Sequence, residues 1–206
     1  MKKTILFALI SAFVFTLNSS AECNQKEVNK LAKKEAKTLK KEGWQVAPGA
    51  LPLQTQLEDA YCKQLDKNEA GLSKYFVGGA QPVSEFYDAA KIQAQTLARF
   101  DIVSQIQTEM KGIIEASVGN KMLSNDEAAS INQVIMKSTE KIGGRLGRTA
   151  PLVECFQKLP NGNTRVMIRI AYPTTQALEE AKEVVREQLE AELKELAEKL
   201  DKVSMK

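Results

Sequence analysis

Hydrophobic and polar residues follow helical and extended patterns along this chain, and together they predict an α+β fold. Apolar residues recur every three or four positions in several stretches, the spacing of one buried helix face. These stretches are 24–42, 53–65, 85–118, 124–142 and 175–203. Shorter apolar runs rich in β-branched and aromatic residues favour strands, and they lie at 75–79, 152–159 and 164–172. We therefore expect a small antiparallel sheet covered by long helices, with helical N- and C-terminal arms.

The two strands 152–159 and 164–172 flank the sequence Pro-Asn-Gly-Asn, which predicts a β-hairpin. Asn-Gly is the preferred centre of a two-residue type I′ turn. With this pair as the loop, one face of the hairpin is mostly apolar and the other carries an opposite-charge pair. The register then pairs Cys155 with Ile168, Val153 with Ile170 and Glu154 with Arg169. It predicts that Cys155 is a buried thiol facing the core.

The last predicted helix is longer than a small domain is wide, because about 29 residues extend for about 43 Å. The end of this helix would extend beyond the domain, pack on the amino-terminal helices or form a dimer contact. Residues 24–43 carry seven lysines against three glutamates, and residues 174–203 carry nine acids against five bases. Packing the first helix on the last, within one chain or between two, would pair these charges. The candidate partner contacts are Trp44, for which a buried position is the simpler account, and Leu193, Leu196 and Leu200.

The first 21 residues have the pattern of a bacterial export signal. Met1-Lys2-Lys3 is basic, 4–17 is almost continuously apolar, and 18–21 is small and polar. The apolar run is too short for a spanning helix, which needs roughly 20 residues. We expect cleavage between Ala21 and Glu22 and a protein of the periplasm or cell envelope. The chain then divides into a signal (1–21), an N-terminal helical arm (22–70) and an α+β core (71–206), with arm and core forming one globular domain.

Cys23 lies close enough to the apolar run to suggest an alternative, an outer-membrane lipoprotein. A lipoprotein signal requires a small residue directly before the cysteine, and Glu22 is a bulky anion. No other segment approaches spanning length, so we expect membrane contact only if Cys23 is lipidated. The three cysteines cannot all pair within one chain, and whether Cys23 and Cys62 form a disulfide stays open.

The composition excludes several kinds of enzyme. The chain has no histidine, which removes Ser-His-Asp triads, Cys-His pairs and HExxH metal sites. No other catalytic arrangement can be assembled, so we expect no enzymatic activity, no catalytic residue, no cofactor and no metal. The formal charge of +3 falls to +1 without Lys2 and Lys3. A nearly neutral exported chain is not expected to bind nucleic acid.

The order of elements from Tyr75 resembles a known family. A strand ending in Gly-Gly precedes an alanine-rich helix (AAKIQAQTLARFDIVSQI), a second helix and a hairpin ending in VMIRIAY. This order is similar to the twenty-kilodalton envelope lipoprotein family of Gram-negative bacteria, to the related amino-terminal domain of a flagellar assembly protein, and to uncharacterised secreted envelope proteins of anaerobic Gram-negative bacteria. The resemblance implies an α+β domain, envelope localisation and no known catalytic residues. The chain departs from the lipoprotein members in its poor lipidation site and its two added helices.

Two functions follow as expectations. The first is a non-catalytic structural or interaction role in the cell envelope, with self-association or binding of an envelope protein through the helical arms, or addition of a peptide strand to the sheet edge at Tyr75. The alternative is a periplasmic protein that binds a small ligand or anion between the sheet and the alanine-rich helix. Its candidate contacts are Gly78, Gly79, Lys141, Arg145 and Arg148. A strand end at the glycines and a solvated basic face at the cations are the simpler accounts of these residues.

Overall fold

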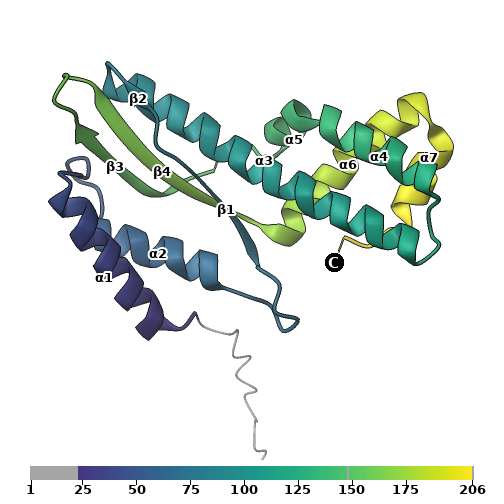
Figure 1. Cartoon of the computed structure of the whole chain (residues 1–206), viewed down its shortest axis with the longest axis horizontal. Helices are drawn as coiled ribbons and strands as arrows, with labels where there is room; N and C mark the ends of the chain where they lie inside the picture. The colour runs from purple at the N-terminus through teal and green to yellow at the C-terminus, as the bar shows by residue number, and fades with distance from the viewer. Residues whose placement is uncertain (1–22, 148, 206) are drawn as a thin grey trace, which may run out of the picture.

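The computed structural model describes residues 23–147 and 149–205 (Figure 1). The predicted export signal, its cleavage site at Ala21 and Glu22, and Arg148 lie outside the described residues. The chain has the expected α+β architecture. Its elements are α1 (Gln25–Lys41), α2 (Leu53–Leu65), β1 (Tyr75–Ala80), β2 (Val83–Ser84), α3 (Tyr87–Gly119), α4 (Asn125–Lys137), α5 (Thr139–Arg145), β3 (Pro151–Lys158), β4 (Thr164–Pro173), α6 (Thr174–Glu192) and α7 (Lys194–Asp201).

β4 is the central strand of the antiparallel sheet. β3 pairs with residues 164–170 of β4, so β1 and β2 lie along the opposite edge, where they pair with 168–173 and 164–165. Both faces of the sheet are covered. Val166, Ile168 and Ile170 belong to a core with α3, while Met167 belongs to a second core with α1 and α2. Val166, Met167 and Ile168 are consecutive apolar residues in β4 because both faces of the sheet are buried.

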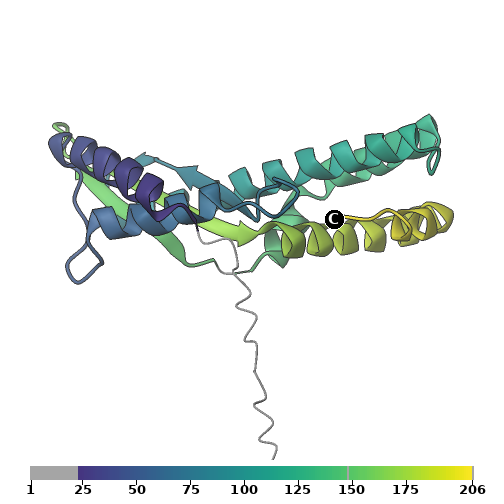
Figure 2. The same cartoon turned by 90° about the horizontal axis from the view of Figure 1, so that it is seen from below.

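α3 joins the two halves of the elongated molecule (Figures 1 and 2). It has 33 residues and is about 50 Å long. Its first half covers the sheet with Ala90, Ala94 and Ala98, which are all completely buried. Its second half packs with α4, α5 and α6 in a helical bundle. The alanine-rich helix noted in the sequence therefore packs closely on the sheet.

Several predicted helix ends are confirmed by the structure. Gly43 follows α1 with φ +87°, a conformation that suits glycine after a helix. Ser124 and Glu127 form a capping box at the start of α4, where the apolar pattern predicts this helix to begin. The predicted continuation to 142 is interrupted at Ser138, whose hydroxyl donates to the carbonyl oxygen of Val134 at 2.7 Å. The chain resumes as α5, and Gly143 lies inside this helix rather than ending it.

The hairpin is present, but its predicted register is wrong by one residue. Cys155 lies opposite Met167 rather than Ile168. The loop residue Gly162 has φ +86°, and its N–H donates to the carbonyl oxygen of Leu159 at 3.0 Å. Pro160 explains the difference, because its fixed φ favours the second position of a type I turn and moves the turn one residue toward the N-terminus. Cys155 is nevertheless buried and free, as expected.

The shifted register also separates the predicted pair Glu154 and Arg169, which contact different partners. Glu154 accepts hydrogen bonds at 2.6 Å from Tyr87 Oη and Lys91 Nζ of α3. Arg169 forms an ion pair with Glu35 of α1. Each charge of the predicted pair is therefore neutralised by a helix that packs on the sheet.

The prediction of one continuous helix over 175–203 is wrong. α6 ends at Glu192, and the chain reverses at Leu193, whose φ and ψ are −148° and 68°. α7 packs back on α6, and Lys182 Nζ donates to the carbonyl oxygens of Asp201 and Val203 at 3.1 and 2.8 Å. The reversal buries the apolar face that a straight helix would leave in solvent. The chain therefore has no projecting C-terminal arm in its described part.

The amino-terminal helices lie on the sheet, far from α6 and α7 (Figures 1 and 2). α1 packs on α2, and α2 packs on β3. A disulfide joins Cys23, before α1, to Cys62 in α2, across 39 residues of sequence. Closing a loop of this length corresponds to about 4 kcal/mol in the chain-entropy account of disulfides. Of the alternatives left open by the sequence, packing of the first helix on the last within one chain is therefore wrong.

Candidate functional site: a cleft at the start of the sheet

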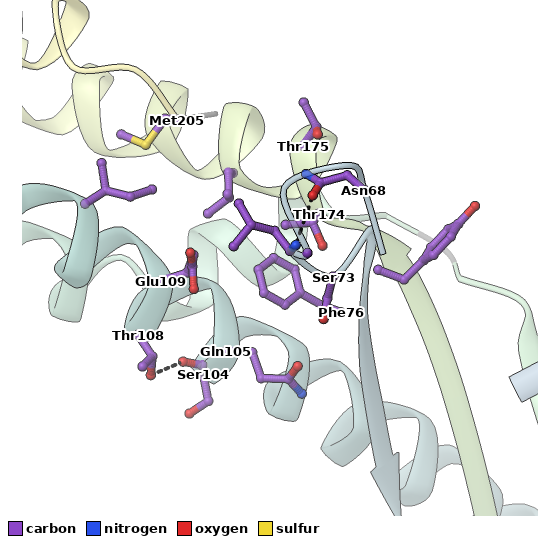
Figure 3. Close-up of a pocket in the computed structure, with 15 residues that line it drawn as sticks. Asn68, Ser73, Phe76, Ser104, Gln105, Thr108, Glu109, Thr174, Thr175 and Met205 are labelled. Atoms are coloured by element: carbon purple, nitrogen blue, oxygen red, sulfur yellow. Dashed lines mark hydrogen bonds between the residues drawn. The ribbon is translucent and has the colours of Figure 1, made fainter. Parts of the chain in front are cut away.

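An open cleft of about 890 Å³ lies between the start of β1, the second half of α3 and the start of α6 (Figure 3). The loop before β1 and the chain end at Met205 complete its walls. A volume of this size is typical of small-molecule sites. The lining residues are Asn68, Gly71, Leu72, Ser73, Tyr75, Phe76, Ser104, Gln105, Thr108, Glu109, Ile113, Thr174, Thr175, Leu178 and Met205.

The floor of the cleft is apolar. Phe76, Leu178 and Met205 are buried, with exposed fractions of 9%, 4% and 7%, and they belong to the main core. Ile113 is half-buried beside them, and Leu72 is half-exposed on the loop above. An apolar molecule placed here would contact five hydrophobic side chains. Its removal from water would stabilise the complex.

Uncharged polar groups surround this floor. Ser104, Gln105 and Thr108 come from one side of α3, and Thr174 and Thr175 begin α6. Glu109 is the single charged side chain among the described residues that line the cleft. A rim of hydroxyl and amide groups with one carboxylate favours a neutral head group and disfavours an anion.

The loop that closes one side of the cleft is shaped by Asn68. Its side-chain oxygen accepts hydrogen bonds from the N–H groups of Ala70 and Leu72 at 3.0 and 2.9 Å. Its backbone N–H donates to the carbonyl oxygen of Leu72 at 2.8 Å. An ion pair between Lys74 and Asp66, at 2.9 Å, holds the base of the loop. Leu72 is therefore positioned over the cleft by local hydrogen bonds, without a ligand.

The wall formed by α6 contains an unsatisfied hydroxyl group. α6 starts at Thr174 after Pro173, and no side chain caps this end of the helix. Thr174 Oγ1 is buried and has no hydrogen-bond partner, and in Figure 3 Thr174 lies beside Phe76. A buried polar group without a partner is costly, by about 1–3 kcal/mol. A ligand hydroxyl or carbonyl that entered the cleft would supply a partner after a rotation of this side chain.

The predicted ligand contacts Gly78 and Gly79 do not line this cleft. A Cβ atom on Gly78 would lie 2.2 Å from the carbonyl oxygen of Ala98 and 2.8 Å from Ile102 Cγ1. Gly78 therefore lets β1 approach α3 closely, and α3 occupies the space that a ligand would need. The N–H of Gly79 donates to Asp101 Oδ2 at 3.0 Å.

The predicted cations are also placed away from the cleft. Arg145 lies at the end of α5 and pairs with Glu187 at 2.6 Å and with Glu183 at 3.9 Å. The hydrogen bond and the charge of Glu187 raise the pKa of Arg145. Because two carboxylates of α6 already surround Arg145, an anion would have to displace them. Lys141 is exposed on α5, and Arg148 lies outside the described residues.

The predicted partner contacts are mostly buried. Trp44 is 5% exposed, and it packs with α1, α2 and β3. Leu200 is completely buried and Leu196 packs against the same core. Leu193, at the reversal between α6 and α7, is 45% exposed. These four residues do not form one exposed surface.

Side chains cap both edges of the sheet. On β1, Gln105 Nε2 donates to the carbonyl oxygen of Val77 at 2.9 Å, next to the bond between Gly79 and Asp101. On β3, Gln56 Oε1 accepts from the N–H of Glu154 at 2.8 Å, and the backbone of Gln45 pairs with Phe156. An added peptide strand would have to displace these bonds. Strand addition at Tyr75, one of the two expected modes of association, is thus opposed by the geometry.

No group of acidic or cysteine side chains within the described ranges could hold a metal ion. None of the helices described is both long and apolar enough to cross a membrane. Comparisons with protein-family models, with curated proteins and with solved structures give no match. The family resemblance drawn from the order of elements therefore stays a prediction.

The sequence alone does not reveal the cleft, because the walls of the cleft come from four distant segments. One weak signal was present in α3, where the hydroxyl residues Ser104 and Thr108 lie four residues apart on the polar side of the helix, next to Glu109. A second was the start of α6, where Pro173-Thr174-Thr175 begins a helix without an acidic residue in its first turn. Neither signal shows that β1 and Met205 lie beside them.

Proposed function

We propose that this chain is an exported, non-catalytic binding protein whose site is the cleft between β1, α3 and α6. The ligand is a small neutral molecule with an apolar body and a hydroxyl or amide head. The observation that carries the proposal is the combination of a buried apolar floor, a rim of hydroxyl and amide groups with the single carboxylate of Glu109, and the unsatisfied hydroxyl of Thr174. Such sites typically take the apolar part of a ligand in the floor and orient its head by a few polar groups.

The localisation belongs to the same proposal. The first 21 residues carry the export pattern, and the disulfide between Cys23 and Cys62 suits an oxidising compartment. A sulfur atom in a disulfide cannot also carry a lipid thioether. The disulfide therefore favours the free periplasmic or envelope protein over the lipoprotein.

Thermal denaturation with matched amphiphiles tests the proposed ligand class. We expect a medium-chain monoacylglycerol to raise the melting temperature, and a fatty acid of the same chain length to raise it less. At a concentration near a hundred times the dissociation constant, the stabilisation would be about 2.7 kcal/mol, or roughly 5–10 °C for a chain of this size. Equal shifts from both molecules, or no shift from either, would contradict the proposed ligand class.

A second candidate function is self-association through an apolar face of α3, in place of the expected arms. Phe86, directly before α3, and Ile92, Leu97 and Phe100, in the half of α3 that covers the sheet, are 66%, 65%, 43% and 43% exposed. Four large side chains exposed by about half present roughly 400 Å² per copy. A standard interface needs about 800 Å² per partner, so a dimer formed here would be weak and transient.

Sedimentation velocity at increasing protein concentration tests this second candidate. We expect the sedimentation coefficient of the unsubstituted chain to rise with concentration and that of Ile92→Lys to stay constant. Leu51→Lys is the matched control, because Leu51 is also exposed, at 58%, but lies outside α3. Identical behaviour of the unsubstituted chain and Ile92→Lys would remove the candidate.

A further inference from the structure

The lysines of α1 lie along one side of the helix, opposite its buried side. At 100° per residue they fall within an arc of about 120°, and they are all exposed. Val28, Ala32, Ala36 and Leu39 form the buried side. The lysine stripe, as we call it, consists of Lys26, Lys30, Lys33, Lys34, Lys37, Lys40 and Lys41.

The charges of the lysine stripe are not neutralised within the protein. In the part of the chain that the structure describes, none of the seven forms an ion pair. Two of the three glutamates of this segment serve other groups, since Glu35 pairs with Arg169 and Glu42 accepts from Trp44 Nε1 at 3.2 Å. The stripe is therefore a net positive surface that faces solvent.

The spacing of these lysines works against the helix that carries them. Lys26 and Lys30, Lys30 and Lys34, Lys33 and Lys37, and Lys37 and Lys41 are like charges four residues apart, which destabilises a helix. A solvated face made for stability would alternate acids with bases. α1 is held instead by its packing on α2 and by the disulfide at Cys23. Folding thus accounts for the buried side of α1 and, through the helix dipole, for Lys40 and Lys41 in its last turn, but not for the five other lysines of the stripe.

A second copy of the chain does not supply the complementary charge. The acids of α6 and α7 are largely engaged within their own bundle, where Glu183 and Glu187 surround Arg145. Arg186 likewise contacts both Glu190 and Asp201. Head-to-tail pairing of α1 with these helices would have to break those ion pairs.

We propose that α1 docks on an anionic lipid membrane with the lysine stripe lying flat on the head groups. The stripe is straight and about 25 Å long, and one open hollow of about 440 Å³ borders it, lined by Lys33, Ala36, Lys37, Lys40, Lys41 and Gln54. A bilayer offers a plane of phosphates that all seven flexible side chains can reach, whereas a linear polyanion is better held in a groove. The apolar side of α1 is buried against the protein, so the helix lies on the surface without inserting. α1 forms the outer layer at the end of the molecule opposite α4 and α7 (Figure 2).

Co-sedimentation with lipid vesicles at low salt tests this docking, using the chain from residue 22 with its disulfide intact. The stripe variant carries Lys30→Gln, Lys33→Gln and Lys37→Gln. The matched control carries Lys111→Gln, Lys137→Gln and Lys141→Gln, which remove the same charge from lysines of α3, α4 and α5 that form no ion pair in the described structure. Circular dichroism and melting temperature show whether both variants stay folded.

We expect binding to vesicles that contain phosphatidylglycerol and none to pure phosphatidylcholine. The stripe variant should lower the partition coefficient by on the order of a hundredfold, about fivefold per lysine, and the control by less than about threefold. Salt should weaken the binding. Equal losses in both variants, or no binding to the anionic vesicles, overturn the proposal. Binding to dextran sulfate without binding to vesicles also overturns it, in favour of a polyanion.

Discussion

Replacing Gly78 by alanine should destabilise the protein strongly, whereas the same change at Gly79 should not. The Cβ of an alanine at Gly78 would lie 2.2 Å from the carbonyl oxygen of Ala98, about 1 Å closer than a normal carbon–oxygen contact. The obstacle is backbone, so α3 would have to move away from β1. Overpacking typically costs 1–3 kcal/mol, and we expect about 3 kcal/mol here. At Gly79 the nearest atoms are 3.5 Å away, an ordinary contact.

Urea denaturation followed by circular dichroism measures the difference between the two variants. We expect Gly79→Ala to stay within about 0.5 kcal/mol of the unsubstituted chain. Gly78→Ala should lower the free energy of unfolding by about 3 kcal/mol, which corresponds in thermal denaturation to a melting temperature lower by roughly 6–12 °C. If the two variants were equally stable, β1 and α3 would not be as close as described. A ligand role for the glycine pair would then be open again.

Three further predictions concern ionisable groups. Burial raises the pKa of the Cys155 thiol to about 12, so iodoacetamide should label Cys155 only as fast as the protein unfolds; rapid labelling at neutral pH would show that this core is open. Glu35→Gln should cost about 2–3 kcal/mol in urea denaturation, because Arg169, whose side chain is 22% exposed, loses its ion pair; a loss below about 0.5 kcal/mol would contradict this. The hydrogen bonds from Lys199 and from the Ser124 N–H hold the pKa of Glu127 below its ordinary value of 4.5. The ionised carboxylate of Glu127 therefore stabilises the folded protein above that pH, and this stabilisation is lost as the pH falls through the lowered pKa. Glu127→Gln should therefore be less stable than the unsubstituted chain at neutral pH, and the difference should shrink as the pH falls through the lowered pKa; a difference that does not change with pH would refute the assignment.

Arg169 lies in the buried strand β4, and its charge is neutralised by Glu35. We call Glu35, Arg169 and Tyr61 the Glu35 cluster. Burial disfavours the charged guanidinium, but the hydrogen bonds and charge of Glu35 outweigh it and leave the pKa of Arg169 raised. Tyr61 Oη donates to the same carboxylate at 2.6 Å. Burial, followed by this bond, raises the pKa of Tyr61. The cluster ties α1, α2 and β4 together across the face of the sheet.

Local signals predicted most of the helices and the hairpin, because their evidence lies within a few residues. Gly43 and the capping box at Ser124 marked helix ends that the structure confirms. The hairpin register predicted from Asn-Gly is wrong because Pro160 shifts the turn. A proline in the loop therefore outweighs a preferred pair beside it.

The remaining errors concern long-range packing. No glycine or proline near Leu193 marks the reversal between α6 and α7, which is favoured by burial of Leu200 and Val203 against the distant core. The two-sided burial of β4 could have been inferred from Val166, Met167 and Ile168, since three consecutive apolar residues serve both faces. The cleft depends on how β1, α3, α6 and the chain end meet, and the sequence pattern does not contain that information.

The most direct test of the binding cleft compares two tryptophan substitutions on α3. Thr108 lines the cleft and Thr96 does not; both are exposed, and each hydroxyl donates to the carbonyl oxygen four residues earlier. Isothermal titration with the monoacylglycerol that stabilises the protein best should give one site in the unsubstituted chain. Thr96→Trp should bind with unchanged affinity, and Thr108→Trp, whose indole occupies the cleft, should lose binding by at least about tenfold. Equal affinity in both variants would place the ligand elsewhere and contradict the proposed function.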